Sequence, residues 1–334
     1  MDPLTQIRLT RALVDIDSTT GREGAAGAWL SELLRSLGYT VTEQPVTDGR
    51  INVVAGLTAA PHVVFSTHID CVPPFFPSRE QDGRLHGRGA CDAKGIAIAQ
   101  VAAAERLRAA AETRIGLLFV AGEERGSDGA MLANTIAPPS RFLINGEPTD
   151  NRLARATRGM YRVRLHARGR AAHSSQPELG VSAIDRLIDA LMALRQVSWP
   201  SDPDLGTTYY TVGVIQGGVA PNVISAEAHA EVMFRTVSDH RPLRALVDHA
   251  IGERAEREDV LHVPPVRLKT LEGLETAVLN FTTDIPFLDR WGTPLLLGPG
   301  SVTQAHTADE SVEIAELLRA TELYVDLAQR LYSV

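Results

Sequence analysis

The sequence has very little cysteine. Only two of its 334 residues are of this type, Cys71 and Cys91. A disulfide framework is therefore not expected, and reduced thiols in a cytosolic compartment are the simpler interpretation. Both cysteines lie close in sequence to the candidate site residues described below. We expect two small buried thiols, with metal ligation by one of them as the alternative.

The sequence also lacks long apolar runs and long basic runs. No stretch approaches ~18 consecutive apolar residues, so no transmembrane helix is expected. The N-terminal segment MDPLTQIRLTRALVDIDSTTG contains acids and has no apolar core, which does not fit a signal peptide. A net charge of −8 argues against nucleic acid or an anionic membrane as the main partner. These absences together predict a cytoplasmic protein.

What is present is typical of a soluble globular protein. Apolar residues make up 44% of the chain and charged residues 22%. A chain of 334 residues is long enough to bury a core without disulfides or structural metals, and its length suggests about two domains.

Helix-like and strand-like segments alternate in the first part of the chain. The spacing of apolar residues predicts helices at 4–17, 23–37, about 93–110 and 127–135. Short apolar runs predict strands in YTVTEQPV, RINVVAGL, PHVVFSTHID, RIGLLFVAGEE and RFLINGEP. Continuous apolar runs such as RIGLLFVAG are typical of strands buried on both faces. The alternation predicts an α/β domain with a mainly parallel sheet.

The pattern changes near residue 156. Strands are expected in MYRVRLHARG, TTYYTVGVIQGG, AEAHAEVMFRT and VLHVPPVRL, and helices in VSAIDRLIDALMALRQV and PLRALVDHAIGERAERE. The resulting order, β-α-β-β-α-β, is that of a ferredoxin-like unit. After about residue 268 the α/β pattern of alternating strands and helices returns, with a strand expected in TPLLLGPG and a helix at 310–332. The smaller domain is therefore inserted into the larger one. We predict a catalytic domain at 1–156 and 269–334 and an inserted domain at 157–268.

Histidine, aspartate and glutamate residues follow the carboxyl ends of the predicted strands. This is the edge of an open α/β sheet at which ligands bind. These residues are His68, Asp70, Glu123, Glu124, Glu147 and His306, with Asp92 in the glycine-rich turn GRGACDAKG before a helix. Adjacent strands would bring them together although they are distant in sequence.

The residue types at this edge suit a pair of metal ions. Imidazole and carboxylate are the ligands that catalytic zinc takes. Five groups suffice for two ions if one carboxylate bridges, and Asp92 is the candidate bridge. The five are His68, Asp92, Glu124, Glu147 and His306. Buried carboxylates without partners would be costly, and a metal cluster removes that cost.

Two further acids are left for supporting roles. Asp70 is close enough to His68 to accept the other ring N–H of that imidazole. Glu123 is assigned as the general base that takes a proton from water. Taken singly, each motif has a simpler explanation. The H-x-D pair could belong to the surface, the Glu-Glu pair to a solvated loop, Asp92 to a helix N-cap and His306 to the surface.

The motifs STHIDCVP, GRGACDAKG, GEE, GEPT and AHTADE together resemble the M20 metallopeptidase family. The match spans nearly the whole chain, with the motifs in the same order. The resemblance implies a zinc-peptidase-like catalytic domain and an inserted α+β lid and dimerisation domain. It implies that His68 and Glu147 hold one zinc, that Glu124 and His306 hold the other, and that Asp92 bridges them. In the family the peptide after the bridging Asp, here Asp92–Ala93, is commonly cis.

The resemblance also implies residues that contact the substrate. GRAAHSS places His173 as an oxyanion or substrate contact that reaches the partner's site in a dimer. GGVAPNVI places Asn222 and VMFRT places Arg235 as binders of a substrate carboxylate, with Arg158 as a weaker candidate. Without the family, His173 could be a loop residue and Arg235 a salt-bridge partner at a strand edge. Ala93 and Ser182 depart from the residues that are common in the family, Met and Asn.

The function expected from this resemblance is cleavage of the amide bond of an N-acyl-L-amino acid, most like acetylornithine deacetylase of arginine biosynthesis. Metal-bound hydroxide would attack, with Glu123 as the base and two zinc ions as cofactors, cobalt or manganese being possible. The partners expected are a small substrate and a second copy of the chain, joined through the lid domain.

Three alternatives stay open at this point. The first is a dipeptidase or aminoacylase with the same residues. The second is a non-catalytic binding homologue, which would be expected to have lost a ligand or the base. The third is a metal-free serine or cysteine hydrolase, for which a G-x-S-x-G nucleophile elbow is missing.

Overall fold

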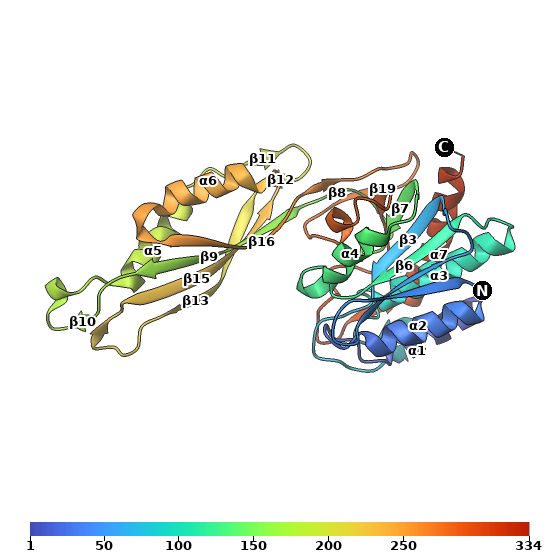
Figure 1. The fold of residues 1–334 in the computed structure, drawn as a ribbon, viewed down its shortest axis with the longest axis horizontal. Coiled ribbons are helices and arrows are strands. Elements are labelled where there is room, and N and C mark those ends of the chain that lie inside the picture. Colours follow the sequence, from blue (N-terminus) through green and yellow to red (C-terminus); the bar gives the residue numbers. More distant parts are fainter. Residues whose placement is uncertain (334) are drawn as a thin grey trace. The chain divides into compact units, whose positions relative to one another are not determined.

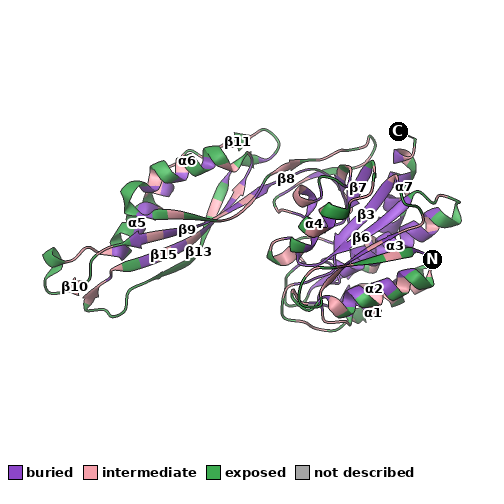
Figure 2. Cartoon of the chain, viewed as in Figure 1, coloured by how far each residue is buried: buried purple, intermediate pink, exposed green. Residues whose placement is uncertain are grey.

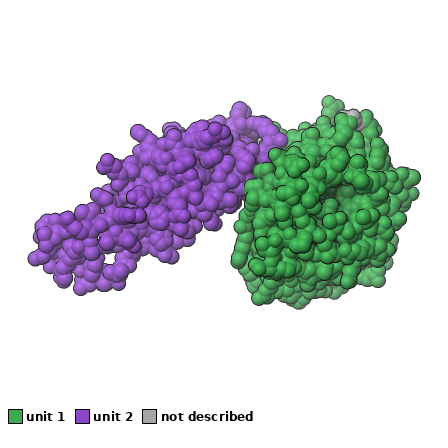
Figure 3. All heavy atoms as spheres, viewed as in Figure 1, with its two compact units in different colours: residues 1–155, 268–277, 283–334 green, residues 156–267, 278–282 purple. Residues whose placement is uncertain are grey.

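The computed structural model describes residues 1–333, which form two compact units (Figure 3). Unit 1 contains residues 1–155, 268–277 and 283–334, and unit 2 contains residues 156–267 and 278–282. Residues 278–282, which the sequence prediction placed in the second part of the catalytic domain, group with unit 2.

Unit 1 is built on a six-stranded sheet with the order β1-β2-β6-β3-β7-β19 (Figure 1). Strands β6, β3, β7 and β19 run parallel, whereas β1 and β2 are antiparallel to their neighbours. The strands are β1 (Thr40–Pro45), β2 (Ile51–Gly56), β3 (Val63–His68), β6 (Ile115–Val120), β7 (Phe142–Asn145) and β19 (Thr293–Leu296). The predicted mainly parallel sheet is confirmed.

The central strands are apolar throughout because both faces of the sheet are covered. Every residue of β3 and β6 is buried (Figure 2). Phe65 and Leu117 pack toward the core that contains residues of four helices, whereas Val64 and Leu118 pack toward α4 and Trp291. The four helices are α1 (Pro3–Val14), α2 (Gly24–Ser36), α3 (Lys94–Ala109) and α7 (Ile314–Leu331), and α4 spans Asp128–Ala133.

Two helix ends in unit 1 differ from the sequence prediction. Helix α1 stops at Val14 rather than at residue 17, and the Asp17 carboxylate accepts hydrogen bonds from the backbone and hydroxyl of Thr19. Such local side-chain bonding competes with helix. Helix α7 begins at Ile314 rather than at residue 310, because Ser311–Glu313 pair as strand β20 with β5 (Arg84–His86).

Unit 2 is a four-stranded antiparallel sheet with the order β13-β15-β9-β16. Its elements are β9 (Gly159–Arg168), α5 (Ala183–Leu194), β13 (Tyr209–Gly217), β15 (Glu227–Thr236), α6 (His240–Ile251) and β16 (Glu256–Val263). One face of the sheet, with Tyr161, Val163 and Leu165, packs against apolar residues of both helices. The predicted ferredoxin-like order is confirmed.

One helix boundary in unit 2 was predicted wrongly. The helix expected across PLRALVDHAIGERAERE ends at Ile251, and the final residues ERE of that segment already belong to β16. Gly252 stands at its C-cap with a φ of 53°, a left-handed value that glycine adopts without strain. Charge-rich, helix-favouring residues therefore form a strand here because β16 completes the sheet beside β9.

Short elements complete the fold. They are β4 (Arg79–Gln81), β8 (Leu153–Thr157), β10 (Ala172–His173), β11 (Ser201–Asp202), β12 (Gly206–Thr207), β14 (Val223–Ile224), β17 (Val266–Arg267), β18 (Thr276–Leu279) and the 3-10 turns η1 (Glu123–Arg125), η2 (Asn134–Ile136), η3 (Pro177–Leu179), η4 (Gly252–Arg254) and η5 (Ile285–Phe287). Across residues 1–333, no helix combines the length and the apolar character needed to cross a membrane.

Candidate metal centre

Three parallel strands of unit 1 deliver candidate ligands to one edge of the sheet. His68 is the last residue of β3 and stands opposite Val120, the last residue of β6. Glu123 and Glu124 follow in the turn η1, and Glu147 comes two residues after β7. These placements agree with the expectation that the carboxyl ends of the strands carry the site.

Two loops add the remaining candidates. Asp92 lies in the turn before α3, and the Asp92–Ala93 peptide bond is cis, as the family resemblance implied. His306 lies in the loop after β19, in the left-handed region with a φ of 62°. A non-glycine residue with this φ is uncommon and is worth inspecting for function.

The five candidate ligands form two groups that share Asp92. His68, Asp92 and Glu147 form the first group, and Asp92, Glu124 and His306 form the second. Within each group the ligand atoms lie within 4.8 Å of one another. Asp92 Oδ1 is 2.9 Å from His68 Nε2, and Asp92 Oδ2 is 3.3 Å from His306 Nε2. The two oxygens of one carboxylate therefore face two different histidines, as a bridging ligand requires.

The remaining distances place each terminal carboxylate beside its own histidine. Glu124 Oε1 is 2.8 Å from His306 Nε2, and Glu147 Oε2 is 4.0 Å from His68 Nε2. Each group thus offers one imidazole nitrogen and two carboxylate oxygens, with room in a tetrahedral shell for a water or a substrate atom. The donor set fits two divalent ions of the zinc type.

Electrostatics at this edge favour bound cations. Burial, with the neighbouring carboxylates, raises the pKa of Glu123 and Glu147 well above the usual glutamate range. Burial also opposes ionisation of Asp92, yet hydrogen bonds from His306 and His68 lower the pKa of this carboxyl. The hydrogen bonds to Asp92 and Glu124 raise the pKa of His306 to about 10. The acids outnumber the imidazoles, so positive ions would relieve the repulsion among them.

Asp70 lies beside the Nδ1 atom of His68, as expected, and makes further contacts. His68 Nδ1 lies 3.0 Å from the backbone oxygen of Asp70 and 3.4 Å from its carboxylate. The carboxylate also accepts hydrogen bonds from the backbone N–H groups of Glu123 and Glu124, at 3.0 and 3.1 Å, and from the Thr20 hydroxyl at 2.9 Å. The nearest partner of the imidazole is thus a main-chain carbonyl, and the Asp70 side chain anchors the turn that carries both glutamates.

The turn η1 explains how the side chains of two adjacent glutamates can both lie at this site. In an extended strand their side chains would point in opposite directions. After β6 the chain enters Gly122 with a φ of 80° and then forms the 3-10 turn Glu123–Arg125. A Cβ at Gly122 would lie 2.1 Å from Asp128 Oδ1, so only glycine fits. The turn holds Glu124 beside His306 and leaves Glu123 unbonded to either histidine in the contacts of residues 1–333.

Sequence reasoning missed two buried features beside these residues. The first is the ion pair of Arg88 and Glu310, which bonds to the turn of Asp92. Glu310 is the last residue of the motif AHTADE, so its position in that motif was an available signal. The second is Asp284, which is 1% exposed and whose carboxylate oxygens make no hydrogen bond of ordinary geometry within residues 1–333, with the Ser127 side chain as the nearby polar group. It precedes the turn η5 rather than following a strand, so the strand-end pattern could not find it.

The predicted substrate-binding residues lie in unit 2. His173 and Asn222 are neighbours, since β10 pairs with β14 and the Ser174 N–H donates to the Asn222 carbonyl. Arg235 lies on β15, inside the sheet rather than at its edge. Arg158 is buried, and its guanidinium donates to Asn280 and to the carbonyl of Thr207 and stacks on Tyr209. These contacts give Arg158 a structural role.

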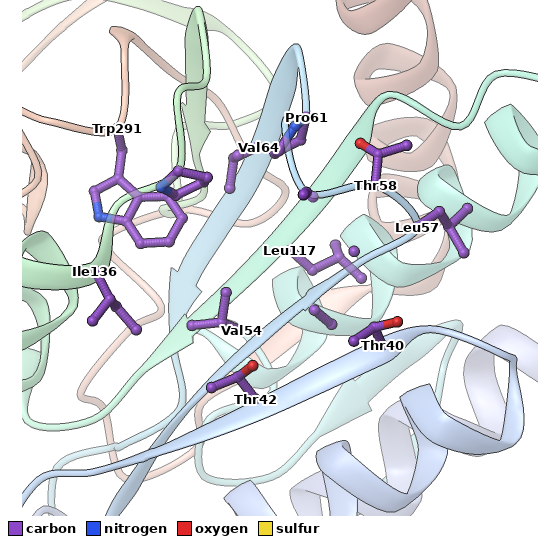
Figure 4. Close-up of a pocket in the computed structure, with 15 residues that line it drawn as sticks. Thr40, Thr42, Val54, Leu57, Thr58, Pro61, Val64, Leu117, Ile136 and Trp291 are labelled. Atoms are coloured by element: carbon purple, nitrogen blue, oxygen red, sulfur yellow. The ribbon is translucent and has the colours of Figure 1, made fainter.

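A separate groove of about 380 Å³ lies on unit 1 at the opposite end of the strands. Val64 and Leu117, near the starts of β3 and β6, line it together with Trp291, Ile136 and Thr42 (Figure 4). The candidate ligands follow the other ends of the same strands. The groove contains no charged side chain and takes no part in the centre.

Comparisons with known proteins agree with this architecture. The model of the family described as Peptidase family M20/M25/M40 matches residues 64–330. A Peptidase M20 domain-containing protein of Schizosaccharomyces pombe is 36% identical over 330 residues, which cover 95% of this chain and 82% of the relative. A protein of Aspergillus terreus named "Probable carboxypeptidase" is 37% identical over 366 residues, which cover 96% of this chain and 84% of that relative.

A solved structure shares the fold. The tripeptidase from Staphylococcus aureus superposes with a TM-score of 0.82 at 21% identity, covering 97% of this chain and 98% of that one.

Proposed function

The chain belongs to peptidase family M20/M25/M40 and is a hydrolase of that family, and on this premise we propose that it cleaves the amide bond of an N-acyl-L-amino acid. The proposed activity is most like that of acetylornithine deacetylase and depends on two divalent metal ions, with zinc as the expected metal. The observation that carries the proposal is the pair of ligand groups that share Asp92.

The roles of the ligands follow from their grouping. His68 and Glu147 would hold one ion, Glu124 and His306 would hold the other, and Asp92 would be shared by both. When bound, such a pair supplies Lewis-acid polarisation of the amide carbonyl and lowers the pKa of a water molecule between the ions.

Glu123 supplies the proton transfers in this proposal. It stands next to the ligand Glu124 and has no imidazole partner in the contacts of residues 1–333. Burial raises the pKa of its carboxyl above the usual glutamate range, toward the working pH, which suits a general base. Glu123 takes one proton from the attacking water and gives that proton to the leaving nitrogen as the C–N bond breaks, so that a neutral amine departs.

Substrate contacts come from unit 2 in this proposal. His173 stabilises the oxyanion of the tetrahedral intermediate, while Asn222 and Arg235 bind the substrate carboxylate. His173 and Asn222 are both exposed and close together through the β10–β14 pair, which supports a joint role. Arg158 is the weakest of the proposed contacts, because its guanidinium already has Asn280 and Thr207 as partners.

A second candidate is hydrolysis of a dipeptide or of the C-terminal residue of a short peptide. The name "Probable carboxypeptidase" of a relative that is 37% identical favours it. Both candidates use the same metal ligands and the same base, so they differ only in the group acylating the amino acid.

We also propose that the chain forms a homodimer through unit 2. Ile184, Ile188 and Met192 form an exposed apolar stripe at helical spacing on α5. The edge strand β13 exposes Val214 and Ile215, with Ile215 61% accessible. An unpaired apolar edge beside an apolar stripe is a surface that a second copy can cover.

Kinetics on the zinc-loaded protein test the proposed activity. N-acetylornithine, N-acetylcitrulline and a dipeptide panel should be compared by their kcat/KM values. A higher value for an N-acetyl amino acid supports the leading proposal, and a strong preference for dipeptides supports the second. Full activity after chelation of the metals would contradict both.

A further inference from the structure

The Arg88–Glu310 ion pair lies beneath the proposed metal centre. Arg88 Nη1 donates to Glu310 Oε2 at 2.6 Å, and both side chains are 1% exposed. A buried ion pair contributes little net stability, since the loss of hydration offsets much of its attraction. Its contacts therefore suggest what it does.

Glu310 organises the turn that carries Asp92. Its Oε1 atom accepts the backbone N–H groups of Gly89, Cys91 and Asp92 at 3.0, 3.1 and 3.0 Å. One carboxylate oxygen thus accepts hydrogen bonds from three main-chain N–H groups of the turn before α3. Charge-assisted bonds of this kind are stronger than neutral ones. These bonds hold the turn in the conformation in which the two oxygens of Asp92 face the two histidines.

Arg88 ties the same turn to the loop of His306. Beyond its bond to Glu310, Arg88 donates through Nη2 to the Thr307 carbonyl at 3.0 Å and through Nε to the Pro74 carbonyl at 3.1 Å. Thr307 directly follows His306, and Glu310 lies three residues further on. The pair therefore joins the segment of the bridging ligand to the segment of the exposed histidine ligand.

The other ligand group is held by the sheet itself. His68 belongs to β3 and Glu147 follows the neighbouring strand β7. Between them, the Gly146 N–H donates to the Ser66 carbonyl at 2.7 Å and the Thr67 hydroxyl donates to the Gly146 carbonyl at 2.8 Å. This group shares Asp92 with the other, but its remaining ligands lie at the end of β3 and two residues after β7, on neighbouring strands that these hydrogen bonds join.

We propose that Arg88 and Glu310 are positioning residues that set Asp92 against His306 and thereby control the affinity of the Asp92–Glu124–His306 group for its divalent ion. Their effect on the His68–Asp92–Glu147 group is smaller, because its other two ligands lie at the ends of adjacent strands and are fixed by the bonds of Ser66 and Thr67 to Gly146. This inference rests on the two-metal arrangement of the proposed function and adds the residues that make its two sites unequal.

Zinc titrations of paired variants test the inference. His306→Ala leaves only the His68 group complete, and Glu147→Ala leaves only the His306 group complete. Glu310→Gln is then added to each, and the zinc dissociation constant is measured by calorimetry. Loss of an outer partner typically weakens metal binding by roughly 10- to 100-fold. In the Glu147→Ala background, we expect Glu310→Gln to weaken zinc binding by that factor. In the His306→Ala background, the factor by which it weakens zinc binding should be about tenfold smaller.

Glu105→Gln is the matched control. Glu105 is also nearly buried and bonds to the Tyr39 hydroxyl and to Arg108, but it lies near the far end of α3. It should leave zinc affinity unchanged in both backgrounds. Equal losses from Glu310→Gln in the two backgrounds, or no loss in either, would overturn the inference.

Arg88→Lys provides a second variant if Glu310→Gln does not fold. Lysine keeps the positive charge beside Glu310 but cannot reproduce the forked bonds to Thr307 and Pro74. It should again weaken the His306 group more than the His68 group, and equal effects would count against the inference. Wild-type protein that binds no zinc would instead contradict the proposed function, so the two failures are distinguishable.

Discussion

Asp92 is the residue on which both ligand groups depend. Its carboxylate lies beside His68 through one oxygen and beside His306 through the other, at 2.9 and 3.3 Å. No other side chain among residues 1–333 belongs to both groups. Its role as a bridge could be proposed from the sequence, because the ligand count required one shared carboxylate and Asp92 alone preceded a helix in a glycine-rich turn.

Glu123 can be tested by removing its carboxylate alone. Glu123→Ala should retain both metal ions, because Glu124 rather than Glu123 stands beside His306. Its kcat should fall by roughly 100- to 10,000-fold, the usual contribution of a general base. Metal content by elemental analysis and steady-state kinetics on the same preparation are the measurements. Unchanged turnover would show that another group takes the proton.

Asp284 should make the stability of the chelated protein depend on pH. Burial raises the pKa of its carboxyl from 3.8 to about 7, although the nearby Ser127 side chain opposes the shift. The folded protein then binds more protons at this residue than the unfolded chain between those two values, so its stability falls as pH rises through that window.

Asp284→Asn removes this dependence. The variant should be more stable than the wild type at pH 8 by on the order of 1–4 kcal/mol and close to it at pH 4. Urea unfolding at both pH values measures the difference. Equal stabilities at pH 8 would mean that the Asp284 carboxylate has a partner when ionised.

Single residues show where prediction from sequence stopped. The strand-end pattern found His68, Glu124 and Glu147 because apolar strands preceded them. It could not find Asp284, which follows no strand that the sequence predicted, and it did not foresee that the Asp70 carboxylate also holds the turn of Glu123 and Glu124. Asp70 was predicted from sequence proximity to lie beside the His68 ring, and in the fold both its carbonyl and its carboxylate face Nδ1, at 3.0 and 3.4 Å, while the carboxylate also holds the turn of Glu123.

Among the elements, the parallel strands β6, β3 and β7 are what gather the centre. These strands could be predicted from the sequence as continuous apolar runs, because both of their faces are buried and polar residues do not alternate with apolar ones. The ends of helices were harder to predict. Helix α6 stops where β16 begins, and the pairing of β16 with β9 outweighs the local helix preference of its charged residues. Such tertiary pairing is invisible in a local pattern.

The chain between β7 and Glu147 leaves no space for a larger residue. A Cβ at Gly146 would lie 2.3 Å from the Ile96 side chain and 2.6 Å from Gln100 Nε2. Gly146→Ala should therefore destabilise the protein by about 1–3 kcal/mol through overpacking. It should also weaken zinc binding, because Glu147 is the next residue.

Gly213→Ala is the control for this substitution, since no atom lies within 4 Å of a Cβ at Gly213. Urea unfolding and zinc titration should show the two losses for Gly146→Ala only. If Gly146→Ala lost stability but kept full zinc affinity, the proposed link between this packing and the position of Glu147 would be wrong.

At the scale of the whole molecule, the proposed dimer depends on the exposed apolar residues of unit 2. Ile188→Glu places a charge in the middle of the α5 stripe and should convert dimer to monomer. Leu4→Glu, at a residue that is 79% exposed on α1 of unit 1, should leave the dimer intact. Light scattering after size exclusion measures the mass of each. A monomeric wild type at micromolar concentration would contradict the proposal.

Zinc-edge anomalous diffraction from crystals grown with zinc tests the central claim most directly. We predict two peaks in each chain, one among His68, Asp92 and Glu147 and the other among Asp92, Glu124 and His306. Both peaks should contact the carboxylate of Asp92. A single peak, no peak, or peaks away from these side chains would contradict the account.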